Sequence, residues 1–158
     1  MNPLEAAFPG LVGTDYRVTS PADDQYNCIA WAASESDRWW WPDALGTAYW
    51  PDGVRRAETP EAFATAYATA GFTSAPDDLL EPGVEKIAVF VKGGKPTHAA
   101  RQLASGRWTS KLGRTEDIEH DLHALAGDIY GAVGFFLQRT RPTTPASLPT
   151  TGAAVRGN

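Results

Sequence analysis

The chain has 158 residues, a net charge of −5 and 42% hydrophobic residues, a composition that fits one globular domain with a sizeable core. The acidic balance argues against nucleic-acid binding, which requires a basic face. The single cysteine excludes an intrachain disulfide, so the fold does not depend on an oxidising compartment. The sequence shows neither a membrane-spanning apolar run nor a secretory signal pattern. We therefore expect a cytoplasmic protein without a membrane partner, or one exported by a route without a classical signal peptide.

The only cysteine, Cys28, stands at the predicted beginning of a helix. Asn27 is a good N-cap residue, and an alanine-rich segment follows it. The pattern predicts a half-buried helix from Cys28 to Trp40 that ends before Pro42. A thiol at the positive end of a helix dipole has a lowered pKa and is more often the reactive thiolate. The alternative is that Cys28 is a buried and inert residue, as most free cysteines are.

Loops and a second helix complete the first half of the chain. Residues 1–24 are rich in proline and glycine and are predicted to be loop-like. The tryptophan-rich segment 39–50 is predicted to cover the core beneath a long loop, although stacked tryptophans also bind sugars or prolines. A second helix is predicted over residues 59–70, because Thr59 can cap its start and Gly71 can end it.

The second half of the chain is predicted to form an antiparallel sheet. A short helix is predicted from residue 115, between the third and fourth strands. Helices of the first half packed on this sheet make a single α+β domain over residues 1–139. The predicted strands are residues 86–92, 97–103, 107–112 and 130–139, the last of them central.

Residues 140–158 are dominated by Pro, Thr, Ser, Ala and Gly, a composition that predicts a disordered tail. The string Leu148-Pro149-Thr150-Thr151-Gly152 within it matches the sortase recognition pattern. A wall-sorting signal would continue into an apolar span and a basic end, which this sequence lacks. We interpret the match as coincidental, or as part of a tag.

His98 is the candidate base for the thiol. It stands at the start of the predicted strand 97–103, after Pro96 and Thr97. A histidine at a strand edge that faces the N-terminus of the cysteine helix has the geometry of a cysteine–histidine pair. Its imidazole would take the thiol proton and later protonate the leaving group. The alternative is a partly exposed histidine at a strand end, without a role in catalysis.

The hairpin turn at residues 104–106 limits which group can orient the imidazole. With a three-residue turn, Ser110 shares a face with His98. With a two-residue turn, Thr109 and Lys111 share that face instead, because a shift of one residue swaps the two sets. We prefer the three-residue turn, which puts Ser110 nearest to His98.

His120 is a second candidate orienter, since serine orients an imidazole weakly. His120 and His123 lie three residues apart on the predicted short helix, and together with His98 and Cys28 they could form a zinc site. Both histidines could equally face solvent. We expect no metal and no cofactor.

A cysteine that opens an amphipathic helix, followed by a strand that starts at a histidine and by a short glycine hairpin, is similar to the papain-like cysteine hydrolase superfamily. The closest branch in layout is that of small bacterial cell-wall amidases and endopeptidases. Three strings also resemble a family of uncharacterised bacterial domains over residues 20–140. These strings are Tyr26-Asn27-Cys28-Ile29-Ala30-Trp31-Ala32, Thr97-His98-Ala99-Ala100-Arg101-Gln102-Leu103 and Trp108-Thr109-Ser110-Lys111-Leu112-Gly113.

The superfamily resemblance implies a papain-like fold and a thiol hydrolase or acyl transferase that acts on an amide of a peptide or protein. Cys28 would be the nucleophile, His98 the base and Ser110 the third residue, where the cell-wall branch usually has histidine, asparagine or glutamine. Papain-type proteases carry an oxyanion glutamine six residues before the cysteine, and this chain has Ala22 there. The oxyanion donor would then be Gln25 or the backbone amide of Cys28. The residues predicted to contact the oxyanion or the substrate are Gln25, Asn27, Trp31 and Lys111.

The alternative function is that of a binding module with a papain-like fold and no catalysis. It would use the tryptophan-rich segment 39–50 as its contact surface, and a large exposed aromatic patch would favour it. For the enzyme, hydrolysis as a peptidase or amidase, acyl transfer and deamidation are all open to this chemistry.

Overall fold

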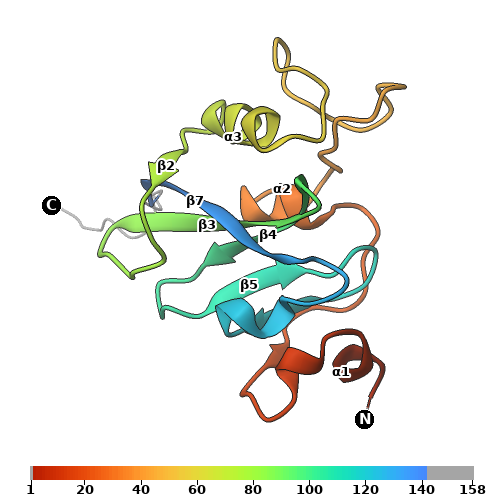
Figure 1. Ribbon diagram of the computed structural model, residues 1–158, viewed down its shortest axis with the longest axis vertical. Coiled ribbons are helices and arrows are strands. Elements are labelled where there is room, and N and C mark those ends of the chain that lie inside the picture. Colours follow the sequence, from red (N-terminus) through yellow and green to blue (C-terminus); the bar gives the residue numbers. More distant parts are fainter. Residues whose placement is uncertain (1, 142–158) are drawn as a thin grey trace, which may run out of the picture.

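The computed structural model describes residues 2–141, which form an α+β domain built on a seven-stranded antiparallel sheet (Figure 1). The strand order across the sheet is β1-β6-β5-β4-β3-β7-β2. The strands are β1 Arg17–Val18, β2 Thr73–Ala75, β3 Val84–Lys92, β4 Lys95–Gln102, β5 Trp108–Lys111, β6 Asp117–His120 and β7 Ala132–Thr140. The helices are α1 Pro3–Ala7, α2 Cys28–Ala32 and α3 Pro60–Ala68, with the 3₁₀ turns η1 Pro9–Leu11 and η2 Leu122–Leu125.

Two hydrophobic cores lie on opposite faces of the sheet, because side chains alternate along each strand. Along β3, Ile87 and Val89 point into the core beneath α2 and α3, which we call the α2/α3 core. Ala88 and Phe90 point into the opposite core, which contains residues of the N-terminal segment and of η2, and which we call the N-terminal core. Figure 1 shows α2 and α3 on one side of the sheet and α1 on the other.

The cysteine helix is shorter than the sequence pattern predicts, since α2 ends at Ala32 instead of Trp40. Ser34 has a φ of 66°, and this left-handed conformation ends the helix. Asn27 then holds the returning chain: its Oδ1 accepts from the Trp40 amide at 3.1 Å, and its Nδ2 donates to the Trp40 carbonyl at 2.8 Å. Trp40 therefore packs back against the start of the helix.

Asn27→Ala is expected to lower the free energy of unfolding by about 2–3 kcal/mol. The change removes the cap to the Ala30 amide and two buried hydrogen bonds to Trp40. Asn2 is the matched control, because it caps α1 through the Glu5 amide at an exposed site, and Asn2→Ala should cost about 1 kcal/mol or less. Urea unfolding measures both variants, and equal losses would contradict the prediction.

The regular elements of the second half mostly lie where the sequence places them. The first three predicted strands are β3, β4 and β5, and the predicted hairpin turn lies between residues 103 and 107. The final predicted strand is β7. It pairs with β3 on one side and β2 on the other, so it is not an edge strand. The helix predicted over residues 59–70 is α3, capped by Thr59 and followed by Gly71 with a φ of 95°.

The helix predicted from residue 115 is wrong. Residues 117–120 form β6, which pairs with β5 on one side and with β1 on the other. Ile118 points into the N-terminal core, while the Asp117 carboxylate on the opposite face accepts from the Tyr26 hydroxyl at 2.8 Å. Two-sided pairing thus overrides the apolar spacing of residues 118–125, of which only η2 is helical.

Further differences lie in the N-terminal segment and the tryptophan-rich segment. Residues 1–24, predicted to be loop-like, include α1, η1 and β1. Trp40 and Trp50 are buried in the α2/α3 core, and Trp41 packs against it, which confirms the predicted covering role.

The predicted disorder of the tail and the sortase-like string at residues 148–152 lie outside the described residues. Within residues 2–141, no helix is both long enough and apolar enough to cross a membrane.

Candidate active site

Cys28 is the first residue of α2 and lines a cavity of about 420 Å³. Its side chain is nearly buried, with 8% of the residue exposed. Asn27 also lines this cavity, and its side-chain oxygen accepts from the Ala30 amide and so caps the start of the helix. Three aromatic side chains form much of the remaining wall: Trp39, Trp41 and Tyr130.

Burial raises the pKa of the Cys28 thiol to about 11, so the resting group is protonated at neutral pH. The backbone amides of Ala99 and Ile29 and the positive charge of Lys111 act in the opposite direction on this pKa but do not outweigh the loss of hydration. The expected lowering of the pKa by the helix dipole is therefore wrong in its net direction. The physical reason is that α2 has only 5 residues while the thiol is shielded from water.

His98 is fully buried on β4, with its ring stacked on Tyr130 at 4.0 Å between centroids and an interplanar angle of 9°. The Phe90 ring meets it edge-on at 5.3 Å. Its Nε2 lies 2.9 Å from the Ser110 hydroxyl, and its Nδ1 is buried without a hydrogen-bond partner among residues 2–141. Nε2 of His98 is thus fixed by a hydrogen bond, while Nδ1 makes none with residues 2–141.

The hydrogen bonds continue from Ser110 to His120. The Ser110 hydroxyl is 2.7 Å from Nε2 of His120, and Nδ1 of His120 is 2.7 Å from the carbonyl oxygen of Asp121. A carbonyl only accepts, so Nδ1 of His120 carries a proton. Burial lowers the pKa of His120 to about 4, so the ring is neutral and its Nε2 accepts from the serine.

This chain of bonds assigns the tautomer of His98. Because the single Ser110 proton is given to His120, the serine oxygen accepts from the Nε2 proton of His98. Burial, followed by the neighbouring His120, lowers the pKa of His98 well below 6.5, so the ring is neutral. Its Nδ1 then bears a lone pair, and this atom has no partner. The arrangement holds a buried base in one defined tautomer.

The hairpin has the register that places Ser110 beside His98. The Leu103 amide donates to the Arg107 carbonyl at 2.7 Å across the turn, and Arg101 pairs with Thr109. The three-residue turn is therefore confirmed, and with it the proximity of Ser110 to His98.

The side chains of Cys28 and His98 lie on opposite faces of the sheet, and His98 does not line the Cys28 cavity. Ala99 packs in the α2/α3 core with Cys28, whereas His98 contacts Phe90 and Tyr130 of the N-terminal core. Among residues 2–141, no hydrogen bond joins the thiol to the imidazole, whose Nδ1 has no partner. Tyr130 links the two groups, because it lines the Cys28 cavity and stacks on His98.

The other predicted site residues have separate roles. Gln25 is exposed, and its Nε2 donates to the Asp24 carboxylate at 3.0 Å, so it does not line the Cys28 cavity. Trp31 donates to the Thr109 hydroxyl at 3.1 Å and fixes α2 on β5 instead of facing the cavity.

Lys111 is fully buried next to the Cys28 cavity without lining it. Its ammonium donates to the carbonyls of Asp23 and Gly113 and lies 4.9 Å from the Tyr26 ring centroid. Since the Lys111 charge also lowers the pKa of Cys28, this residue supports the site electrostatically and ties the chain before α2 to the chain after β5.

Tyr130 is a residue of the candidate site that the sequence pattern did not predict. The signal that could have found it is the pair of glycines around it: Gly127 and Gly131 form an isolated bridge. A Cβ at Gly131 would lie 2.3 Å from the Val91 carbonyl oxygen, so only glycine permits this close approach. The tight turn presents Tyr130 to both His98 and the cavity.

The zinc arrangement that the sequence left open is not formed. His123 is exposed, while both ring nitrogens of the buried His120 are taken up by Ser110 and Asp121. Within the described part of the chain, no group of three or more His, Cys, Asp or Glu side chains could hold a metal ion.

The two buried histidines are expected to make the fold sensitive to acid. Below about pH 6.5 the unfolded chain binds protons that neutral His98 and His120 in the folded state do not, so stability falls as the pH falls. For His120, the interval between 6.5 and about 4 corresponds to roughly 3 kcal/mol. Urea unfolding between pH 7.5 and pH 4 measures this loss. His123→Gln, at an exposed histidine, should leave the slope unchanged, and a pH-independent stability of the parent protein would refute the assignment.

The sheet, the two cores and the buried thiol define an α+β domain with a single cysteine at a cavity wall. Residues 17–138 match a family described as a domain of unknown function (DUF7689), and the chain belongs to this family. The match carries no link to the papain-like superfamily that the sequence resembles. No curated protein and no solved structure matches the chain.

Proposed function

We propose that the protein is a cysteine-dependent hydrolase or acyl transferase that acts on an amide bond of a peptide or protein. Cys28 is the nucleophile, His98 is the general base, and Ser110 with His120 positions the base. The observation that carries this proposal is Nδ1 of His98, a buried nitrogen with a lone pair and no partner, in a ring whose other nitrogen is held by Ser110.

The raised pKa of Cys28 favours a mechanism in which proton removal accompanies attack. Nδ1 of His98 takes the thiol proton as the sulfur bonds to the substrate carbonyl carbon. His98 then returns this proton to the leaving amine as the carbon–nitrogen bond breaks, which leaves a thioester on Cys28. Water completes hydrolysis of the thioester, and a second amine completes transfer. The backbone amide of Cys28, in the first turn of α2, is the proposed donor to the oxyanion.

A papain-like packing is part of this proposal. It is supported by the order of the elements, in which a helix that begins at Cys28 is followed by a strand with His98 and by the adjacent strand with Ser110. The proposal requires a rearrangement that brings the thiol and Nδ1 of His98 within reach of each other. We assign this movement to the Tyr130 side chain, which lines the cavity and stacks on the imidazole.

The test is acylation by a small activated ester, p-nitrophenyl acetate, at pH 7. An unassisted thiol with a pKa of about 11 is about 100-fold less ionised than one at the ordinary value of 9, so it should react more slowly than free cysteine. A burst of p-nitrophenol that exceeds the rate of free cysteine and disappears in Cys28→Ala supports the proposal. A rate below that of free cysteine, with the label absent from Cys28 in mass spectra, would overturn it.

The second candidate is a binding module without catalysis. The observation that favours it is the aromatic wall of the cavity, formed by Trp39, Trp41 and Tyr130 around a protonated thiol. Its contact surface would be this cavity, since Trp40 and Trp50 are buried. Acylation by p-nitrophenyl acetate distinguishes the enzyme from the binding module, because a binding module releases no burst of p-nitrophenol.

A further inference from the structure

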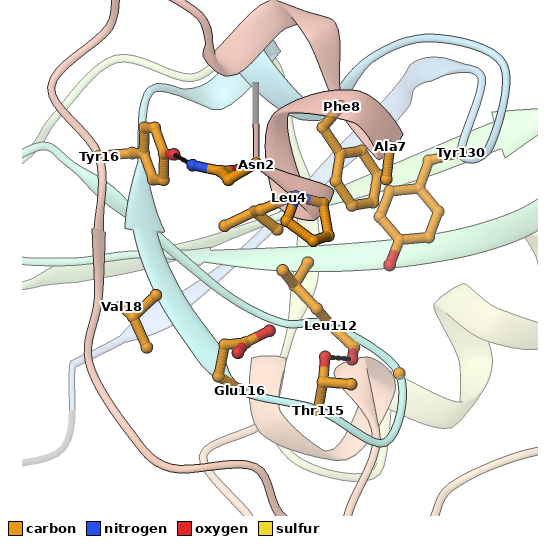
Figure 2. Close-up of a pocket in the computed structure, with 12 residues that line it drawn as sticks. Asn2, Leu4, Ala7, Phe8, Tyr16, Val18, Leu112, Thr115, Glu116 and Tyr130 are labelled. Atoms are coloured by element: carbon orange, nitrogen blue, oxygen red, sulfur yellow. Dashed lines mark hydrogen bonds between the residues drawn. The ribbon is translucent and has the colours of Figure 1, made fainter.

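A second cavity of about 580 Å³ lies between α1 and the turn that follows β5. Figure 2 shows Leu4, Phe8, Leu112 and Tyr130 converging on it. Val18 of β1 also lines this cavity and is 52% exposed. Among the lining residues, only one carries a charge, Glu116. The chemistry of the wall thus suits an apolar group.

This cavity adjoins the Cys28 cavity through two shared residues, Gly113 and Tyr130. Tyr130 stacks on His98, and its ring also lies 5.1 Å from the Phe8 ring of the second cavity. Tyr130 is therefore a wall of both cavities and is in contact with His98.

The Cys28 cavity also adjoins a polar depression. The two share Trp39, Thr47 and Ala48, and the depression includes Arg38, Arg114 and Asp24. The Cys28 cavity is thus bordered both by charged side chains and by an apolar cavity.

The chemistry of amide cleavage orients a substrate in this cleft. The leaving nitrogen must lie near the imidazole that protonates it, so the amine part of the substrate extends toward His98. Tyr130, which stacks on His98, also lines the apolar cavity. We propose that this cavity binds a large apolar side chain on the amine side of the scissile bond. This inference rests on the proposed function of Cys28 and His98 and adds the substrate class that the site selects.

The experiment uses the acylated enzyme and simple amines as acceptors, so it needs no natural substrate. After acylation by p-nitrophenyl acetate, the thioester is captured at pH 8.5 by glycinamide, leucinamide or phenylalaninamide, and the acetylated products are quantified. Leucinamide and phenylalaninamide should capture the acetyl group about tenfold faster than glycinamide, the discrimination that an apolar pocket offers for a few carbon atoms.

Val18→Asp and Val12→Asp form a matched pair. Both valines are about equally exposed, at 52% and 51%, but only Val18 lines the cavity. Val18→Asp should remove most of the preference for apolar amines, and Val12→Asp should keep it. Equal capture of glycinamide and leucinamide by the parent protein, or the same loss in both variants, would overturn the inference.

Binding of phenylalaninamide to the Cys28→Ala protein, measured by ligand-detected NMR, tests the cavity apart from the chemistry. Binding that Val18→Asp weakens and Val12→Asp does not supports the apolar site, whereas equal binding by both variants counts against it. Absence of the p-nitrophenol burst would instead overturn the proposed function, and with it the assignment of the cavity to the amine side.

Discussion

Replacing His98 by glutamine is expected to lower the rate of Cys28 acylation by about 10²- to 10⁴-fold, the range in which one general base contributes to catalysis. The effect is large because burial raises the pKa of the thiol to about 11, so almost no thiolate forms at pH 7 without a base. Glutamine can still donate to Ser110 but has no basic nitrogen in the place of Nδ1.

The pH profile distinguishes this role from a structural one. With His98 present, the rate should be nearly flat between pH 6 and pH 9, because the imidazole is already neutral. In His98→Gln, the rate should rise about tenfold per pH unit toward pH 11, as the thiolate forms. Stopped-flow release of p-nitrophenol measures both profiles, and thermal unfolding verifies that the variant is folded. A flat profile in the variant would show that His98 is not the base.

His123→Gln is the control for this experiment. His123 is exposed on η2 and contacts neither the cavity nor the hydrogen-bonded chain from His98 to His120. Its substitution should change the acylation rate by less than about twofold, as is usual for surface positions.

Ser110→Ala is the second substitution with a large expected effect. It removes the hydroxyl that bonds to both His98 and His120, so one buried ring nitrogen of each histidine loses its partner. We expect a loss of about 2–3 kcal/mol in the free energy of unfolding. Since the tautomer of His98 is no longer held, the acylation rate should also fall by about 10- to 100-fold.

Nitrogen-15 NMR of the imidazoles reads the tautomer directly. In the parent protein, the spectrum should show a protonated Nε2 and an unprotonated Nδ1 on His98. Ser110→Ala should convert this pattern into a mixture of tautomers. Thr109→Ala is the matched control, because the neighbouring hydroxyl accepts from Trp31 on the other face of the sheet. An unchanged His98 pattern in Ser110→Ala would show that the serine does not set the tautomer.

Several features of the site follow from local sequence. Asn27 caps the helix that begins at Cys28, because its side chain bonds to an amide only 3 residues further along. The turn after Leu103 sets the hairpin register, and with it the placement of Ser110 beside His98. Such features depend on neighbours a few residues apart, which the sequence displays.

Other features depend on contacts between distant residues. The chain that follows the cysteine helix returns to Asn27, whose side chain binds the Trp40 backbone 13 residues away. The segment at residues 117–120 is a strand because β5 and β1 pair with it on both sides. The spacing of apolar residues does not indicate either of these contacts. The helix predicted for residues 117–120 was therefore wrong.

Local sequence patterns are sufficient to predict an α+β domain with its one thiol at a helix start and with serine beside the candidate base. The protonation state and surroundings of these groups follow from the tertiary packing. This packing buried Cys28 and so raised its pKa to about 11, it joined His98 through Ser110 to His120, and it stacked Tyr130, a residue of the Cys28 cavity, on His98. The reason is that helix caps and turns are local, whereas dehydration and proton positions depend on everything that packs around a group.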